Sequence, residues 1–265
     1  MKRRRKVVVQ IIREAGGKLA ENFGRPQHVE YKGAVDLVTA MDRASEDHIL
    51  SRLKAAFPED DILTEERDQE VRRSENLWIV DPLDATNNYA HGFPMFCVSI
   101  AFERLGRVVL GAIYDPLRDE MFLAEAGEGA ALNGMALTAS STPHLDVSLV
   151  ATGFPYDKRE SPVNNLDHFQ RFALRTQGVR RTGSAALDLA YVAMGRLDGF
   201  WELKLSPWDV AAGALLVQEA GGRVTDFAGG GDFIYGGEVV ASNGRIHQEM
   251  LVTLSEGSDG KRSRG

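Results

Sequence analysis

The stretch Trp78-Ile-Val-Asp-Pro-Leu-Asp-Ala-Thr-Asn-Asn-Tyr-Ala-His-Gly-Phe-Pro94 decides the fold of this chain. The apolar run from Leu77 to Val80 predicts a strand, and this strand leads directly into Asp81 and Asp84. Pro82 between them favours a turn, so we expect a tight turn at the sheet edge that brings both carboxylates into one small space. Two such charges about 4 Å apart repel by roughly 4 kcal/mol at an effective dielectric near 20. A bound cation would offset that cost.

Composition narrows the class of protein. The 265 residues are 43% hydrophobic, enough for a large core in one domain or in two closely packed halves. The net charge of −7 argues against nucleic acid as a partner. The sequence has no run of about 18 apolar residues, so we expect no transmembrane helix and no membrane partner. A single cysteine, Cys97, excludes an internal disulfide and a multi-cysteine zinc site, and indicates a reducing cytoplasm.

The order of predicted elements differs between the two halves of the chain. Residues 1–145 begin with helices over 5–23 and from Thr39 onward, followed by a strand over 61–66 and an antiparallel meander. Residues 146–254 alternate strands and helices, and residues 255–265 read as a disordered tail. The meander strands are predicted at 97–103, 108–114 and 120–125, and the later elements at 149–152, 165–176, 178–181, 185–194, 199–203 and 210–220.

Five acidic residues stand at strand ends or helix starts: Asp42, Glu65, Asp81, Asp84 and Asp209. Each has an ordinary structural explanation when taken alone, such as a capping box with Thr39 for Asp42 or an N-cap for Asp209. Together they offer oxygen-only ligands, which suit a hard cation such as Mg²⁺. The sequence contains no H-E-x-x-H, P-loop or G-x-S-x-G motif, so zinc hydrolase, P-loop and serine hydrolase chemistry are disfavoured.

Two longer motifs resemble the signatures of the inositol monophosphatase family. The first is Asp81-Pro-Leu-Asp-x-Thr86, with Trp78 before it and His91-Gly-Phe-Pro94 after it. The second is Trp208-Asp-Val-Ala-Ala-Gly213, ending in Glu219-Ala-Gly-Gly222. Further matches are Asp36-Leu-Val-Thr-x-x-Asp42, Glu65-Glu66, and the bacterial-type segments Gly183-Ser-Ala-Ala-Leu-Asp-Leu-Ala190 and Trp201-Glu202. The similarity covers roughly residues 5 to 253. It implies an α+β fold, the layered αβαβα sandwich of inositol monophosphatase and fructose-1,6-bisphosphatase, and a homodimer.

The resemblance also implies an activity and the residues that carry it. The reaction is Mg²⁺-dependent, lithium-sensitive hydrolysis of myo-inositol 1-phosphate to inositol and phosphate by metal-activated water, with two or three Mg²⁺ ions per site. By resemblance, the first ion is held by Glu65, Asp81 and the carbonyl of Leu83, and the second by Asp81, Asp84 and Asp209. Asp42, Glu65 and Thr86 match the catalytic residues. The substrate contacts fall on Asp84, Ala85, Thr86, Ala185 and Glu202.

The motifs leave alternatives open. The same scaffold serves phosphatases of fructose 1,6-bisphosphate, 3′-phosphoadenosine 5′-phosphate and NADP, and the metal-binding motifs do not separate these substrates. A non-catalytic regulatory or binding protein on a phosphatase scaffold is an alternative of another class. The family usually has Gly-Thr-Thr-Asn where this chain has Ala85-Thr-Asn-Asn88. If this loop requires a positive φ, Ala85 costs of order 1 kcal/mol or more.

Overall fold

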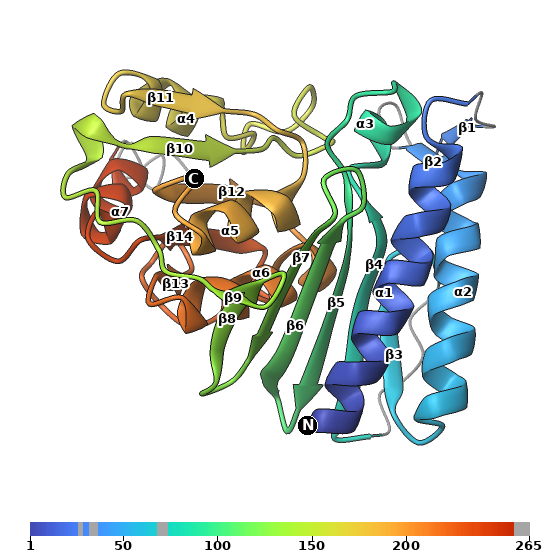
Figure 1. Cartoon of the computed structure of the whole chain (residues 1–265). Helices are drawn as coiled ribbons and strands as arrows, with labels where there is room; N and C mark the ends of the chain where they lie inside the picture. The colour runs from blue at the N-terminus through green and yellow to red at the C-terminus, as the bar shows by residue number, and fades with distance from the viewer. Residues whose placement is uncertain (26–28, 32–36, 68–73, 257–265) are drawn as a thin grey trace.

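The computed structural model describes residues 1–25, 29–31, 37–67 and 74–256. The motif residue Asp36 and the predicted tail beyond residue 256 lie outside these ranges. Two large sheets and three helical layers make up the fold (Figure 1). Within the described ranges, every helix is too short or too polar to cross a membrane.

A seven-stranded sheet forms the first half, in the order β3-β4-β5-β6-β7-β8-β9. The edge strand β3 runs parallel to β4, and the other neighbours are antiparallel, as the predicted meander requires. The strands are β3 (Asp61–Thr64), β4 (Asn76–Asp84), β5 (Cys97–Arg104), β6 (Arg107–Asp115), β7 (Glu120–Glu125), β8 (Gly129–Leu132) and β9 (Met135–Ala136).

Strand β4 continues further than expected. It runs through Pro82 to Asp84, so the predicted turn at Pro82 is wrong. The pairing with β5 is irregular here, since Asp81 faces Ser99 and Asp84 faces Cys97. Proline has no N–H to donate, and such an irregularity is where a strand accommodates it. The chain leaves the sheet at Ala85, directly after the second aspartate.

Helices α1 (Lys2–Asn22) and α2 (Ala40–Ala56) cover one face of this sheet, on the right in Figure 1. The amphipathic stripe predicted for α1 is confirmed, because its apolar residues are buried against alternate side chains of β4, β5 and β6. Trp78 lies at the centre of this layer and stacks on Phe57, at 5.4 Å between ring centroids.

Helices α5 (Ala185–Ala193) and α6 (Pro207–Glu219) form the middle layer and pack against the opposite face of the seven-stranded sheet. Both helices are apolar on nearly all sides, as predicted for α6. They approach each other closely at Gly213, where a β-carbon would lie 2.5 Å from Leu189 Cβ. The glycine of the second signature therefore serves packing between these helices.

A five-stranded sheet, in the order β11-β10-β12-β14-β13, covers the far side of α5 and α6. Its outer face is covered by α4 (Leu166–Ala173) and α7 (His247–Ser255). The αβαβα layering is thereby confirmed (Figure 1). The strands are β10 (Leu149–Thr152), β11 (Gly178–Arg180), β12 (Gly199–Leu203), β13 (Arg223–Thr225) and β14 (Glu238–Ser242); the short elements are β1 (Val29–Tyr31), β2 (Leu37–Thr39), α3 (Thr86–Ala90) and η1 (Leu145–Val147).

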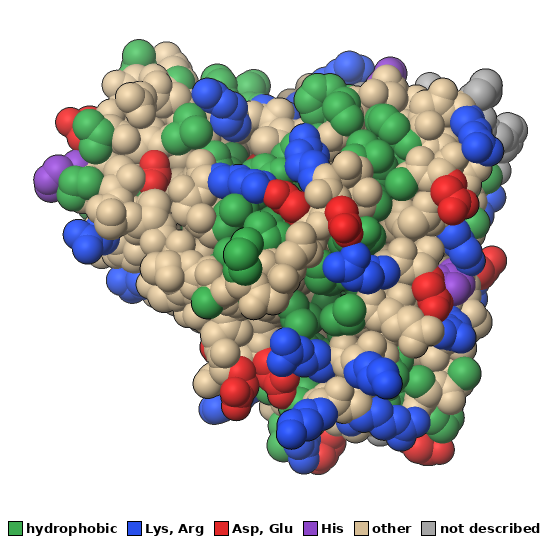
Figure 2. Space-filling view, viewed as in Figure 1, with side chains coloured by type: hydrophobic (Ala, Val, Ile, Leu, Met, Phe, Trp, Pro, Cys, Tyr) green, Lys and Arg blue, Asp and Glu red, His purple; other side chains and the backbone are tan. Residues whose placement is uncertain are grey.

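The surface charges are mixed. Figure 2 shows acidic and basic side chains interspersed over the face seen in Figure 1. Opposite charges at short separation largely cancel at a distance, and salt screens what remains. The strongest local fields therefore arise where like charges are buried together, which happens between the two halves of the chain.

Candidate active site

The acidic residues predicted as metal ligands lie together. Asp81 and Asp84 end strand β4, and Glu65 follows the parallel strand β3, whose last residue, Thr64, pairs with Val80. Glu65 is therefore placed beside Asp81. Burial raises the pKa of Asp81 well above its usual range, and the charges of Glu65, Asp84 and Asp209 raise it further. Four carboxylates from three separate segments of the sequence thus interact at one place.

Asp209 joins this group from the first turn of α6. Its Oδ2 accepts a hydrogen bond from Ser206 N at 2.7 Å. The N-cap of the helix is Ser206, so the prediction that Asp209 itself is the N-cap is wrong, and Asp209 is the third residue of the helix. Desolvation raises the pKa of Asp209 to about 7, and the charge of Asp84 contributes. The shift therefore reflects burial first and the neighbouring like charge second.

Asp84 connects the two halves of the molecule. Its Oδ2 accepts hydrogen bonds from Ser184 Oγ, from Ala186 N at 3.0 Å and from Cys97 Sγ at 3.5 Å. The sequence analysis did not assign these donors. Ser184 is also the N-cap of α5, where its Oγ accepts from Leu187 N at 3.2 Å. The position of Ser184 just before an apolar helix favours such a cap. No local sequence pattern predicts its hydrogen bond to Asp84.

Asp42 and Thr86 form a second buried pair. Thr86 Oγ1 donates to Asp42 Oδ1 at 2.6 Å, while Asp42 Oδ2 accepts from Thr39 N at 2.7 Å and from Thr39 Oγ1 at 2.6 Å. The predicted capping box is confirmed. Burial raises the pKa of Asp42, and the bonds from Thr39 and Thr86 partly oppose that rise. In this pair, the Asp42 carboxylate orients the Thr86 hydroxyl by accepting its hydrogen bond.

Ala85 follows Asp84 and directly precedes Thr86. Its backbone lies in the left-handed region, at φ 74°, ψ 49°. From the sequence, Ala85 is strained only if this loop requires a positive φ, and the structure shows that φ is positive. For an L-residue with a β-carbon it costs roughly 1–2 kcal/mol. The local strain lies where the backbone turns from β4 into α3.

A cavity of about 350 Å³ opens at these residues. Six predicted site residues line it: Glu65, Asp84, Ala85, Ala185, Glu202 and Asp209. Asp42, Asp81, Leu83 and Thr86 are buried next to it, and Leu83 O lies 3.1 Å from Thr86 Oγ1. The sequence analysis missed other residues of its walls, among them Phe154, Tyr156, Arg181, Asp188 and Lys204.

The donor chemistry of the site fits a divalent cation. The interacting groups are carboxylates, which are the ligands that Mg²⁺ prefers, and their mutual repulsion is the cost that a cation would remove. Among the described residues, no three His, Cys, Asp or Glu side chains are already placed to hold one ion. The match between this site and a divalent cation therefore rests on the type of the donor groups, on their burial and on their electrostatic interaction.

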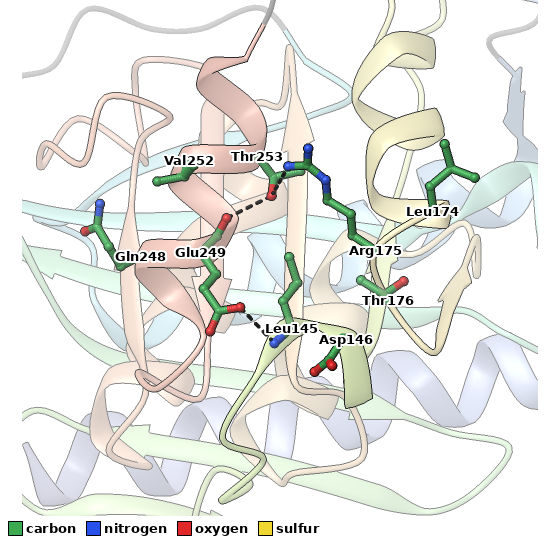
Figure 3. Close-up of a pocket in the computed structure, with 9 residues that line it drawn as sticks. All are labelled: Leu145, Asp146, Leu174, Arg175, Thr176, Gln248, Glu249, Val252 and Thr253. Atoms are coloured by element: carbon green, nitrogen blue, oxygen red, sulfur yellow. Dashed lines mark hydrogen bonds between the residues drawn. The ribbon is translucent and has the colours of Figure 1, made fainter.

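A second cavity, of about 560 Å³, lies between α7, η1 and the end of α4 (Figure 3). Its polar groups bond to one another: Glu249 Oε2 accepts from Leu145 N at 3.2 Å, and Arg175 contacts Thr253 Oγ1 at 3.3 Å. Arg175 also forms an ion pair with Glu256 at 2.7 Å. Because its charges are compensated locally, this cavity lacks the like-charge cluster that marks the first.

Comparisons with known proteins agree with this architecture. The chain is 46% identical to the inositol-1-monophosphatase of Mesorhizobium japonicum over 253 residues, which cover 94% of this chain and 95% of that protein. It is 42% identical to Nus factor SuhB of Escherichia coli K12 over 258 residues, with the same coverage. The crystal structure of extragenic suppressor protein SuhB from Bartonella henselae superposes with a TM-score of 0.90, at 41% identity, covering 95% of this chain and 98% of that one.

A more distant structure shares the fold and contains the expected ion. It is an inositol monophosphatase/NADP phosphatase complexed with Mg²⁺ and phosphate, with a TM-score of 0.86 at 24% identity, covering 97% of both chains. The model of the inositol monophosphatase family matches residues 1–259 of this chain. The chain therefore belongs to the inositol monophosphatase family.

Proposed function

We propose that this protein hydrolyses the phosphate monoester of a small polyhydroxylated alcohol in the presence of Mg²⁺, with myo-inositol 1-phosphate as the preferred substrate. The observation that carries the proposal is the convergence of Glu65, Asp81, Asp84 and Asp209 beside a cavity. Relatives named inositol-1-monophosphatase, at 42–46% identity, support the choice of substrate. Lithium sensitivity is part of the proposal.

Two or three Mg²⁺ ions would be held by Glu65, Asp81, Asp84, Asp209 and the carbonyl of Leu83. Bound there, the ions would neutralise the phosphate and activate water for in-line attack. The protein contributes rigid placement of the carboxylates. Asp84 is fixed by Ser184, Cys97 and Ala186 N, and Asp81 Oδ1 is fixed by Leu83 N at 3.0 Å.

Asp42 and Thr86 would activate the attacking water. The hydroxyl hydrogen of Thr86 is directed to Asp42 Oδ1, which leaves the Thr86 oxygen able to accept a hydrogen bond from water. As the water gives its proton to Thr86, Thr86 would pass its own hydroxyl proton to the Asp42 carboxylate, whose pKa burial raises, so that it accepts a proton more readily. The bonds from Thr39 keep that carboxylate in place.

The remaining cavity walls would bind the ester. The amides of Ala85 and Thr86 would hold the phosphate where the chain turns into α3. Ala185, at the start of α5, and Glu202, on β12, would meet hydroxyls of the alcohol. Gly153 leaves room for the Glu202 carboxylate, since a β-carbon there would lie 2.0 Å from Glu202 Oε1.

A panel of phosphate esters tests the proposal. Release of inorganic phosphate is measured from myo-inositol 1-phosphate, fructose 1,6-bisphosphate, 3′-phosphoadenosine 5′-phosphate and NADP, each with Mg²⁺, with EDTA, and with added lithium. We expect the highest kcat/KM for inositol phosphate, no activity with EDTA, and inhibition by lithium. Faster turnover of another ester would overturn the substrate while leaving the chemistry intact.

A regulatory or binding protein on the same scaffold is the second candidate function. Two observations favour it: several relatives are named Nus factor SuhB, and the strained Ala85 stands where the family usually has glycine. The same panel separates the two candidates. If the protein releases no phosphate from any ester with Mg²⁺ present, the binding role is the better account.

A further inference from the structure

Asp188 is a buried carboxylate on the wall of the cavity that the proposed reaction does not use. It lies in α5, the helix whose first turn holds Asp84 through Ser184 and Ala186 N. Its residue exposure is 1%, yet it lines the same cavity as Glu202. Within the described residues, the one hydrogen bond to its carboxylate comes from Thr182 Oγ1 to Oδ1, at 2.8 Å. A carboxylate has about four acceptor positions, so this bond leaves most of them unused.

The surroundings of Asp188 indicate what it would bind. Its charge interacts with those of Asp84 and of Glu202 on strand β12, and the charge of Arg181 partly offsets those of Asp188 and Glu202. The guanidinium of Arg181 lies close to the backbone, because Nη1 is 2.5 Å from the position that a β-carbon of Gly183 would occupy. The single charge of Arg181 leaves the pair of carboxylates Asp188 and Glu202 negative. Neutral hydrogen-bond donors therefore suit these two carboxylates better than a further anion does.

We infer that Asp188 is a specificity-determining residue that accepts a hydrogen bond from a hydroxyl of the substrate alcohol, a different one from the hydroxyl that meets Glu202. The inference rests on the proposed function, since it concerns the alcohol side of the same site. It narrows the substrate class to phosphate esters of alcohols that carry at least two free hydroxyls. A site with acceptors built for hydroxyls discriminates strongly against an ester that lacks them, because buried polar groups are then left unsatisfied.

The test compares two esters in the wild-type protein and in Asp188→Asn. Myo-inositol 1-phosphate presents hydroxyls to the cavity walls, whereas p-nitrophenyl phosphate presents none. We expect kcat/KM for inositol phosphate to fall about 10- to 100-fold in the variant, mainly through KM, and kcat/KM for p-nitrophenyl phosphate to stay within about 2-fold. The inhibition constant of free myo-inositol, measured against p-nitrophenyl phosphate, should rise in parallel.

Two further variants protect the test against a folding defect. Thr182→Val removes the bond that orients Asp188 but keeps its charge, and should lower selectivity in the same direction by a smaller factor. Asp115→Asn changes an equally buried aspartate that does not line the cavity and accepts hydrogen bonds from Leu117 N and Arg118 N, and it should leave the ratio of the two esters unchanged.

Each other outcome overturns the inference. If Asp188→Asn lowers turnover of both esters equally, Asp188 acts through Asp84 and α5 and touches no substrate hydroxyl. If it changes neither ester, Asp188 is only structural. If the wild-type protein hydrolyses neither ester, the proposed function fails, and the inference that rests on it fails too.

Discussion

Thr86 Oγ1 donates a hydrogen bond of 2.6 Å to Asp42 Oδ1, although 44 residues separate the two in sequence. The bond joins the first turns of α3 and α2, and both side chains are buried. Asp42 also completes the capping box of α2. One carboxylate therefore fixes the start of a helix and orients the hydroxyl that we propose activates water.

Removing that hydroxyl should impair chemistry more than binding. We expect Thr86→Val to lower kcat by about 10²- to 10⁴-fold with little change in KM, because general-base assistance acts in the transition state. Thr86→Ser retains the hydroxyl and should keep most of the activity. Steady-state kinetics on myo-inositol 1-phosphate give kcat and KM for both variants. A valine variant as active as the serine variant would contradict a role of the Thr86 hydroxyl in activating water.

Ala85→Gly should stabilise the protein and keep or raise its activity. Glycine tolerates φ 74° without the β-carbon clash, and part of that gain is lost to the greater freedom of glycine in the unfolded chain, so we expect a net gain of up to about 1 kcal/mol. Leu105→Gly is the matched control, since Leu105 has φ 54° and is 62% exposed in a turn remote from the cavity.

Thermal melts and kinetics of both variants separate strain from function. Both glycine variants should melt at a higher temperature, and only Ala85→Gly should alter turnover. A large loss of activity in Ala85→Gly would show instead that the alanine is fitted to the phosphate loop.

Stabilisation by Mg²⁺ should grow with pH. Asp209 has a folded pKa of about 7, above the ordinary value of 3.8, so between about pH 4 and pH 7 the folded protein binds more protons than the unfolded chain. The stability of the metal-free protein therefore falls as pH rises through this window. Mg²⁺ binds the deprotonated carboxylates, so the rise in Tm that it causes should be larger at pH 8 than at pH 5.

Melting curves with EDTA and with Mg²⁺ at pH 5, 6, 7 and 8 measure this effect. Asp209→Asn removes one titrating ligand and should reduce the difference between pH 8 and pH 5. Equal stabilisation by Mg²⁺ at both pH values in the wild-type protein would show that the carboxylates do not form the ion site.

His247 should make the protein sensitive to acid. It is fully buried between Thr225 and Ser242, with its ring nitrogens 3.0 Å and 2.9 Å from their hydroxyl oxygens. Burial, assisted by the charge of Arg223, lowers its pKa to about 4 from 6.5. The unfolded chain binds the extra proton, so stability is complete above about pH 6.5 and falls by up to about 3 kcal/mol as pH drops toward 4.

Chemical denaturation at pH 7 and pH 5 tests this in His247→Gln. The variant should be less stable at pH 7 but should lose less between the two pH values than the wild-type protein does. His144→Gln, which changes a histidine with a 71% exposed side chain, should behave as wild type. An unchanged pH dependence in His247→Gln would assign the acid sensitivity to other groups.

Features that depend on local pattern were predictable from the sequence. The strand predicted at 120–125 is β7 (Glu120–Glu125), and the Thr39–Asp42 spacing placed the start of α2. The acidic motifs also located Glu65, Asp81, Asp84 and Asp209 at element ends, where strands and helices deliver side chains to a common edge.

Features that depend on contacts between distant segments were not predictable. The strand through Pro82 required knowledge of the irregular pairing with Ser99 and Cys97. The bond from Ser184 to Asp84 spans 100 residues, and no local preference encodes it. Asp188 likewise reads as an ordinary helix carboxylate until the fold places it on the wall of the cavity that Glu202 also lines.

The central claim is that the carboxylate cluster supports Mg²⁺-dependent hydrolysis of a phosphate monoester. The most direct measurement is phosphate release from myo-inositol 1-phosphate as a function of Mg²⁺ concentration, in the wild-type protein and in Asp209→Asn. We predict Mg²⁺-dependent release by the wild-type protein and a loss of at least about 10²-fold in the variant. Release without Mg²⁺, or equal release by the variant, would contradict the claim.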